Sequence, residues 1–311
     1  MEKLYTRDIY GKTLVDLGKQ DSEIVVLDAD LSGSTRTSFF RKEFPERFFN
    51  LGVAEQNMMA VSAGLASCGK IVFVSTFAMF ATIRALDQVR NTICYNNLNV
   101  KIVASHGGIT VGEDGASHQA LEDVNFLRAI PNVKIVVPCD AEETKNAVIA
   151  AYKTDGPFYI RLGRSKVPTI DKKKDFVLGK GYIVEEGRDL AIISCGIMVY
   201  ESLVALNFLK EKGYSACVVN MPTIKPIDEN LIVELGKKYK KILVCEEHQV
   251  RGGLYSAVCE VLGRRCPVNL DCVGIKDEFG QSGSPSELME FYELSSRFIA
   301  RKAESLLRQQ D

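Results

Sequence analysis

Short runs of β-branched and other apolar residues alternate along the chain with longer amphipathic stretches. This alternation is typical of a parallel sheet whose strands are connected by helices. The helix expected at residues 141–153 follows Asp140, an acceptable N-cap, and carries Glu142 and Glu143 in its first turn. In the first half we predict strands at residues 23–28, 70–75, 100–105, 133–137 and 158–162, and helices at residues 54–67, 79–95, 120–129 and 141–153.

The pattern breaks at residues 163–180, where proline, a lysine run and few apolar residues indicate a connection between domains. We therefore predict an α/β protein of two domains, residues 1–165 and 179–311, joined by a linker at residues 166–178. Each domain is expected to be a largely parallel sheet flanked by helices. In the second domain the expected strands are residues 190–194, 216–220, 242–245 and 268–273, and the expected helices are residues 199–212, 229–238, 254–262 and a closing helix from Ser286.

The composition is that of an ordinary folded chain, since 46% of its 311 residues are hydrophobic and 25% are charged. The 39 basic and 40 acidic side chains give a formal net charge of -1, which offers no broad basic field to nucleic acid or anionic lipid. No uninterrupted apolar run approaches the ~20 residues of a membrane span. We therefore expect a cytoplasmic protein whose partners are small molecules or other proteins, without contact to nucleic acid or membrane.

The 9 cysteines are an odd number and include no CxxC pair. Their spacing argues against a disulfide framework and against a zinc site. Cys195, Cys217 and Cys245 each lie inside an apolar run. We interpret them as small, reduced core residues.

Polar residues that follow strands are the first candidates for chemistry, because ligands of parallel α/β sheets bind beyond the carboxyl ends of the strands. The sequence DADLSGST after the strand at 23–28 supplies Asp30 and Ser34. Glu55 is the most unusual charge, since the helix that it begins continues with the almost wholly apolar or small residues MMAVSAGLAS. It is either a carboxylate that stabilises the helix start or a desolvated carboxyl that shares a proton with a bound heterocycle.

A glycine-rich loop, residues 106–119 with the sequence HGGITVGEDGASHQ, follows the strand at 100–105. It contains His106 and His118, two of the three histidines of the chain, together with Asp114. Neutral histidine beside a carboxylate suits hydroxyl recognition and proton transfer to a small polar substrate, and a turn with surface histidines is the other interpretation. We expect no metal ion on this chain, since two imidazoles without HxH or HxxxH spacing form a poor ligand set.

Phe77 and Phe80, in STFAMF after the strand at 70–75, are three residues apart and would share one face of a helix. Core packing is the default interpretation of such a pair, and a flat ligand ring stacked on them is the alternative. Phosphate-binding P-loops, the GxSxG elbow and a GxGxxG after the first strand are all missing from the sequence. These absences give no support to nucleotide-binding or serine-hydrolase functions.

Taken together, DADLSGST, LGVAEQN, STFAMF and HGGITVGEDGASHQ resemble in order and spacing the pyrimidine-binding domain of the transketolase family of thiamine diphosphate enzymes. The resemblance continues through GPFYIRLGRS, and the sequence from residue 178 onward is similar to the C-terminal domain of that family. It implies a transketolase that moves a two-carbon ketol unit from a ketose phosphate to an aldose phosphate. Thiamine diphosphate would serve as the electron sink.

The resemblance also implies which residues contact the cofactor. Glu55 would hydrogen-bond the N1′ nitrogen of the aminopyrimidine ring, and Asp30 would lie near the cofactor. Phe77 and Phe80 would pack on the pyrimidine ring. Ile83 departs from the family pattern, because some members carry a tyrosine at that position.

For the substrate, the resemblance places His106 and His118 as catalytic residues at the reacting oxygen. Together with Asp114 they would also contact the substrate hydroxyls. The positions that would grip the sugar phosphate, as the charge and geometry of a dianion favour, are Arg7, Ser34 and Arg164.

The larger departure is a missing motif. Family members hold the diphosphate through Mg²⁺ on a separate domain with a GDG motif and a later Asn, and this sequence contains no GDG. The chain therefore resembles the C-terminal subunit of a split transketolase, with the cofactor and Mg²⁺ bound at an interface with a separate N-terminal subunit. We expect an α2β2 assembly that includes a self-dimer, and no catalysis by this chain alone.

Other functions stay open at this point. They are the β subunit of a 2-oxo acid dehydrogenase, an enzyme like 1-deoxy-xylulose-phosphate synthase, and a non-catalytic scaffold or regulatory paralogue. The loop at 106–118, together with Arg7, Ser34 and Arg164, suits a polyhydroxylated phosphate better than an oxo acid. The intact site residues argue against a scaffold. The preferred sugars stay open too, and we expect a structural or interface role for His248.

Overall fold

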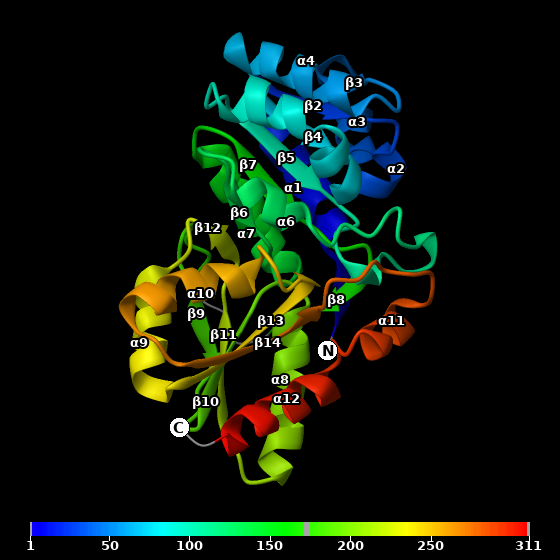
Figure 1. The fold of residues 1–311 in the computed structure, drawn as a ribbon. Helices are drawn as coiled ribbons and strands as arrows, with labels where there is room; N and C mark the ends of the chain where they lie inside the picture. Colours follow the sequence, from blue (N-terminus) through cyan, green and yellow to red (C-terminus); the bar gives the residue numbers. More distant parts are fainter. Residues whose placement is uncertain (1, 171–174, 310–311) are drawn as a thin grey trace.

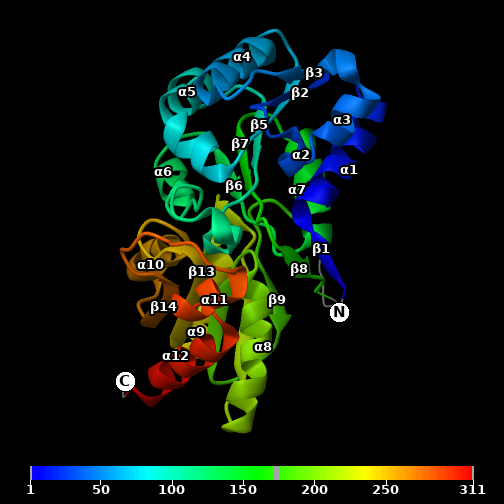
Figure 2. The ribbon, with the colours of Figure 1, turned by 90° about the vertical axis from the view of Figure 1, so that its right-hand side faces the viewer.

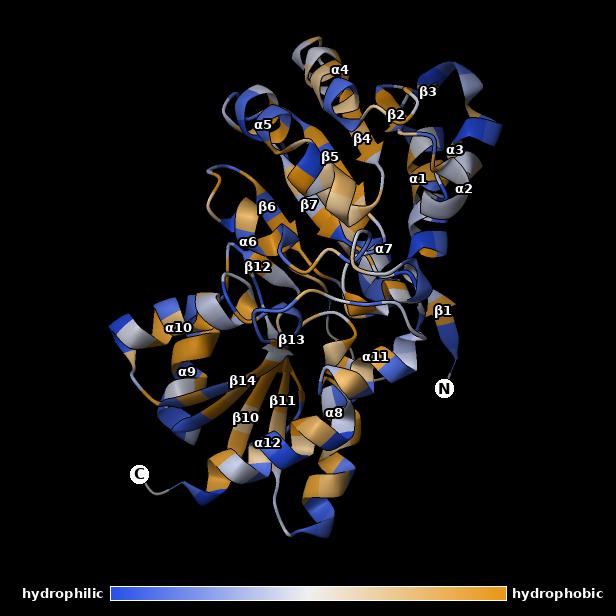
Figure 3. Cartoon of the chain, turned by 45° about the vertical axis from the view of Figure 1, so that its right-hand side comes forward, coloured by the Kyte–Doolittle hydropathy of each residue, from blue (hydrophilic) through white to orange (hydrophobic). Residues whose placement is uncertain are grey.

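The structure, a computed structural model, describes residues 2–170 and 175–309 and consists of two α/β domains placed end to end (Figure 1). The domains remain distinct bodies when the molecule is turned by 90° (Figure 2). In each of them helices flank a central sheet, which confirms the predicted fold class. Hydrophobic residues fill the strands and polar residues lie mainly on the outer faces of the helices and in the loops (Figure 3).

The first domain is built on a seven-stranded sheet with the order β12-β6-β7-β5-β4-β2-β3. Its five predicted strands are all present, and short β3 extends one edge. Neighbouring strands from β6 to β3 run parallel, so their carboxyl ends meet at one edge of the sheet. The strands of this domain are β2 (Ile24–Asp28), β3 (Phe48–Asn50), β4 (Ile71–Ser75), β5 (Val100–Ala104), β6 (Lys134–Val136) and β7 (Phe158–Arg161).

The helices of the first domain include three that the hydrophobic pattern did not predict, the long α1 and the short α2 and α3. Gly11 and Gly18 let α1 approach the segment that follows β2, since a Cβ on them would lie 2.6 Å from the Arg36 carbonyl oxygen and 2.5 Å from the Phe40 ring. The helices are α1 (Thr6–Gln20), α2 (Ser32–Thr35), α3 (Ser38–Glu43), α4 (Glu55–Ser67), α5 (Leu86–Gln88), α6 (Asp123–Arg128) and α7 (Ala141–Lys153), with 3₁₀ segments η1 (Pro45–Arg47) and η4 (Ile109–Asp114) and π segments η2 (Phe80–Arg84) and η3 (Val89–Cys94).

Two predicted helices of this domain differ from the structure. The helix expected at 79–95 is not one α-helix, because η2 and η3 are wider π turns with α5 between them. The helix expected at 120–129 begins only at Asp123, because Ala120 forms a parallel bridge with Gly107 instead. The N-cap prediction is confirmed, since the Asp140 carboxylate accepts a 2.9 Å hydrogen bond from the backbone N–H of Glu143.

The second domain has a five-stranded sheet with the order β14-β13-β10-β11-β9, in which only the β9 edge strand pairs antiparallel. The closing helix expected from Ser286 is two helices, separated where Glu293 adopts a φ of 57°. The elements are β9 (Tyr182–Glu185), α8 (Met198–Glu211), β10 (Leu190–Ser194), β11 (Ala216–Asn220), α9 (Glu229–Tyr239), β13 (Lys241–Gln249), α10 (Leu254–Arg265), β14 (Asn269–Ile275), α11 (Pro285–Phe291) and α12 (Ser296–Arg308).

The two domains are tied together by chain that crosses between them. β12 (Thr223–Lys225) belongs to the second half of the sequence but pairs antiparallel with β6 of the first domain. β1 (Lys3–Tyr5) pairs antiparallel with β8 (Lys166–Pro168), so part of the expected linker is a strand. Residues 171–174 of that linker lie outside the described residues.

One apolar core cluster contains side chains of both domains, among them Val137 and Cys195. Cys195, Cys217 and Cys245 are fully or almost fully buried, as predicted for core cysteines. Among the described helices, none combines the length and apolar character that crossing a membrane requires.

Candidate active site

Glu55 is the first residue of α4, and its side chain is only 2% exposed. A carboxylate at this position is stabilised by the positive end of the helix dipole. The Arg84 guanidinium also donates to both carboxylate oxygens, each at 3.0 Å. Arg84 was not predicted from the sequence, because only the packing of η2 against α4 brings two residues 29 positions apart into contact.

The two phenylalanines after β4 form the predicted aromatic pair, with ring centroids 6.0 Å apart and planes 19° from parallel. They do not share a helix face, because Phe77 forms a strand-like bridge with Ser105 and the helical residues begin only at Ala78, with Phe80 as the first residue of η2. The Arg84 guanidinium lies over the Phe80 ring at 4.1 Å. Glu55, Arg84 and the aromatic pair are therefore contiguous.

His106 and His118 complete this aromatic face. The His106 ring stacks on Phe77 at 3.8 Å, and the His118 ring meets Phe80 edge-on at 5.3 Å. Burial, together with the nearby charges of Arg7 and Arg164, lowers the pKa of His106 to about 3. His106 is therefore neutral at physiological pH, and its Nδ1 lies 2.9 Å from the Ser105 hydroxyl.

Basic side chains lie beside the histidines. Arg7 donates to the backbone carbonyl of Ser34 at 3.1 Å, and Arg164 donates to Glu113 and to the carbonyl of Val111, both at 2.6 Å. Burial, with Arg36 and Arg164 close by, holds the pKa of Arg7 below its ordinary value. The structure thus gathers the three residues expected at the phosphate into the neighbourhood of His106.

The two remaining predicted residues lie at the margin of this arrangement. Asp30 has a φ of 65° and exchanges hydrogen bonds with the Asn50 side chain. The side-chain oxygen of Asn50 also accepts from the N–H of Gly52, shortly before α4. Asp114 is exposed at the end of η4. Neither aspartate touches the aromatic face directly in the contacts of the described residues.

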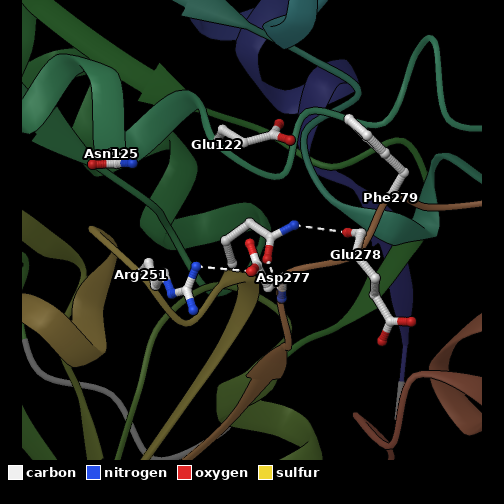
Figure 4. Close-up of a pocket in the computed structure, with 7 residues that line it drawn as sticks. Glu122, Asn125, Arg251, Asp277, Glu278 and Phe279 are labelled. Atoms are coloured by element: carbon white, nitrogen blue, oxygen red, sulfur yellow. Dashed lines mark hydrogen bonds and ion pairs between the residues drawn. The ribbon is translucent and has the colours of Figure 1, made fainter.

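A pocket of about 220 Å³ lies elsewhere, at the junction between the domains (Figure 4). Several of its polar groups pair with one another, since Arg251 pairs with Asp277 at 2.8 Å and Gln249 donates to the backbone of Glu278 at 2.8 Å. None of the predicted site residues lines this pocket. The candidate site is thus the open face at the carboxyl ends of β2, β4 and β5, apart from this pocket.

A flat, nitrogen-containing ring fits this face. The buried Glu55 carboxylate supplies an acceptor for a ring nitrogen, and the stacked Phe77 and Phe80 rings supply an aromatic surface. Neutral His106 can exchange a proton with an oxygen of a second ligand. These features suit an α/β protein that binds a heterocyclic cofactor.

Comparison with known families agrees with this class. The family described as "Transketolase, pyrimidine binding domain" matches residues 2–169, and "Transketolase, C-terminal domain" matches residues 179–299. The chain therefore belongs to the transketolase family, and it corresponds to the C-terminal section of such an enzyme. A pyrimidine-binding domain of this family implies dependence on thiamine diphosphate.

Individual relatives agree. A Methanocaldococcus jannaschii protein named as an inferred transketolase C-terminal section is 52% identical over 300 residues, covering 94% of this chain and 93% of that protein. The solved structure of a split gene transketolase, an inactive beta4 tetramer, matches with a TM-score of 0.89 and 46% identity, covering 98% of this chain and 99% of that one. Transketolase from Pichia stipitis, in complex with sedoheptulose 7-phosphate, matches with a TM-score of 0.86 and 25% identity, covering 99% of this chain and 46% of that one.

Proposed function

We propose that this chain is the C-terminal subunit of a two-chain transketolase that transfers a two-carbon ketol unit from a ketose phosphate to an aldose phosphate. The observation that carries the proposal is the contiguous face formed by buried Glu55, the Phe77–Phe80 pair and neutral His106. Nothing in the packing of an α/β domain requires this combination of residues. Bound thiamine diphosphate would supply the electron sink that carbon–carbon bond cleavage beside a carbonyl requires.

Each residue of this face would have a distinct task. Glu55 would hold and share a proton at the N1′ nitrogen of the aminopyrimidine ring, and Phe77 with Phe80 would orient that ring by stacking. His106 and His118 would contact the substrate hydroxyls and move a proton at the reacting oxygen, with Asp114 as a further hydroxyl contact and Asp30 near the cofactor.

Arg7, Ser34 and Arg164 would bind the phosphate of the sugar. Two guanidinium groups suit a dianion, because their fork of N–H donors matches phosphate oxygens. The Nε atom of Arg7 supports this assignment, since it is a buried donor that has no acceptor among the described residues. The Pichia stipitis relative was solved with a sugar phosphate.

A separate N-terminal subunit would supply the other side of the site. Apolar side chains beside Glu55 and η2 are exposed, with Val53 at 72% and Ile83 at 42%, and a partner surface would cover them. The partner would hold the diphosphate through Mg²⁺, and the assembly would be α2β2 with contacts between two copies of this chain. The match to a split gene transketolase, and to less than half of the single-chain enzyme, supports this arrangement.

Reconstitution tests the proposal. The chain is mixed with the N-terminal section of a split transketolase, thiamine diphosphate and Mg²⁺, and ketol transfer from xylulose 5-phosphate to ribose 5-phosphate is followed. We expect activity in the mixture and none with either chain alone. Full turnover by this chain alone, or no turnover with any N-terminal section that binds it, would reject the proposal.

Arg164→Ala tests the phosphate site. We expect a rise in KM for phosphorylated sugars equivalent to about 1 to 3 kcal/mol, because charge-assisted hydrogen bonds to phosphate are lost. Steady-state kinetics with phosphorylated and unphosphorylated acceptors measure the effect. The unphosphorylated acceptor is the internal control, and an equal effect on both acceptors would contradict the phosphate role of Arg164.

A further inference from the structure

The loop that carries His106 and His118 rests on the second domain. Glu247, a residue of β13, accepts a 2.7 Å hydrogen bond from the backbone N–H of Thr110. Farther along the loop, the Gln119 side chain donates to the carbonyl of Gln281 at 3.0 Å. The second domain is therefore in direct contact with both ends of this loop.

The turn immediately after His106 is pressed against two buried side chains. A Cβ on Gly108, which has a φ of 94°, would lie 2.3 Å from the Glu247 carboxylate, and one on Gly107 would lie 2.8 Å from the Arg161 side chain. Arg161 in turn donates to the backbone carbonyl of Glu247 at 3.1 Å. Glycine at these positions thus permits the close approach of the loop to the second domain.

His106 is itself in an unfavourable backbone conformation, with a φ of 61°. A non-glycine residue keeps such a conformation only where its surroundings impose it. Backbone hydrogen bonds from Gly107 to Leu162 and from Gly108 to Ala120, both 3.0 Å, come from the first domain. The Thr110 hydrogen bond to Glu247 adds the constraint that comes from the second domain.

We propose that Glu247 is a positioning residue, which holds the loop from the second domain so that His106 keeps its place at the active site. The role at the active site rests on the proposed function of the chain. It also assigns a task to the second domain, whose own sequence shows no catalytic motif.

The hydrogen-bond acceptor on Glu247 is the feature that matters. Burial raises the pKa of the Glu247 carboxyl, against the opposing effect of Arg161. Glutamine keeps an acceptor of the same length, whereas alanine leaves the buried Thr110 N–H without a partner. Glu247→Gln should therefore retain the loop position that Glu247→Ala loses, and Glu247→Asp, one methylene shorter, should lie between them.

Glu246 provides a matched control. It precedes Glu247 on β13, is also buried, and faces the other side of the strand, where it accepts from the N–H groups of Leu254 and Tyr255 at 2.7 and 2.9 Å. Glu246→Ala therefore removes a buried acceptor of the same kind without touching the loop. A general loss of stability would appear in both alanine variants.

The first experiment measures kcat, KM and Tm in the reconstituted enzyme. We expect Glu247→Ala to lower kcat by about tenfold to a hundredfold, because displacement of a reacting group costs rate at this scale. Glu247→Gln should restore most of kcat, and Glu246→Ala should lower Tm while leaving kcat within about twofold. An unchanged kcat in Glu247→Ala, or an equal loss in Glu246→Ala, would overturn the proposal.

The second experiment needs no activity. The chain contains only 3 histidines, so NMR of ¹³C-labelled imidazoles resolves His106 in the isolated chain, without a partner subunit. Its pKa of about 3 predicts no titration above pH 5 in the unmodified chain. We expect Glu247→Ala, or Glu247→Asp if alanine prevents folding, to shift the His106 signal and raise its titration midpoint, and Glu246→Ala to leave both unchanged.

A His106 signal in Glu247→Ala, or in Glu247→Asp if alanine prevents folding, that is identical to the signal in the unmodified chain would overturn the positioning role. If the unmodified reconstituted enzyme transfers no ketol unit, the proposed function fails, while the NMR comparison still decides whether Glu247 positions His106.

Discussion

Glu55→Gln is expected to lower kcat for ketol transfer by about 10²- to 10⁴-fold in the reconstituted enzyme, because an amide cannot share a proton with the ring nitrogen of the cofactor. The side chain is almost fully buried, and glutamine has nearly the same volume, so the fold should persist. Steady-state kinetics measure kcat, and circular dichroism with the Tm verifies folding.

Glu23→Gln is the control for this substitution. Glu23 makes the same kind of ion pair, 2.8 Å to Lys70, but it is half-exposed. This pair lies at the amino ends of β2 and β4, opposite to the carboxyl ends where the candidate site lies. We expect full activity in this variant. Undiminished turnover in Glu55→Gln would reject the catalytic role of Glu55, and a comparable loss in both variants would attribute the effect to lost stability.

Arg161→Leu is expected to lower the free energy of unfolding by about 3 to 5 kcal/mol, because it leaves the Asp123 carboxylate buried without its ionic partner. The Arg161 side chain is 6% exposed and Asp123 is 0% exposed, with 2.8 Å between Nε and Oδ2. Tyr159 would remain as a hydrogen-bond donor to the same carboxylate oxygen. Urea unfolding followed by circular dichroism measures the change.

A matched arginine on the surface separates this effect from the substitution itself. Arg297 pairs with Glu290 at 2.9 Å, and both side chains are largely exposed. Arg297→Leu should cost about 1 kcal/mol or less, because solvent screens an exposed ion pair. Equal losses in Arg161→Leu and Arg297→Leu would show that burial of the Asp123 pair contributes little to stability.

The alternation of apolar and amphipathic segments was sufficient for the fold class and for nearly all central strands. It was insufficient where local pattern and tertiary packing disagree. Helix α1 mixes polar, apolar and glycine residues. Its two glycines are explained only by the close approach of Arg36 and Phe40. The π turns of η2 were not predicted either. They help to place Arg84 next to Glu55, a contact that no local pattern encodes.

Candidate site residues were found because parallel strands bring their carboxyl ends to one edge, so Glu55, Phe77 and His106 stood out by position as well as by type. The structure places Phe77 against His106 and Phe80 against His118. No local pattern distinguishes Glu247 from Glu246, its neighbour on the same strand. Its partner Thr110 is 137 residues away, and only the docking of the domains makes it a neighbour of the loop.

The sequence by itself determined the class of fold and the edge of the sheet where chemistry is expected, because both follow from local periodicity and from the end of each strand, which are properties of contiguous residues. The residues expected at a pyrimidine ring and at a phosphate came from the resemblance to the transketolase family. Tertiary structure alone decided that Arg84 pairs with Glu55, that His106 is buried and neutral, and that the second domain supports the loop. Each of these depends on contacts between residues far apart in the chain, where burial and charge are set by packing.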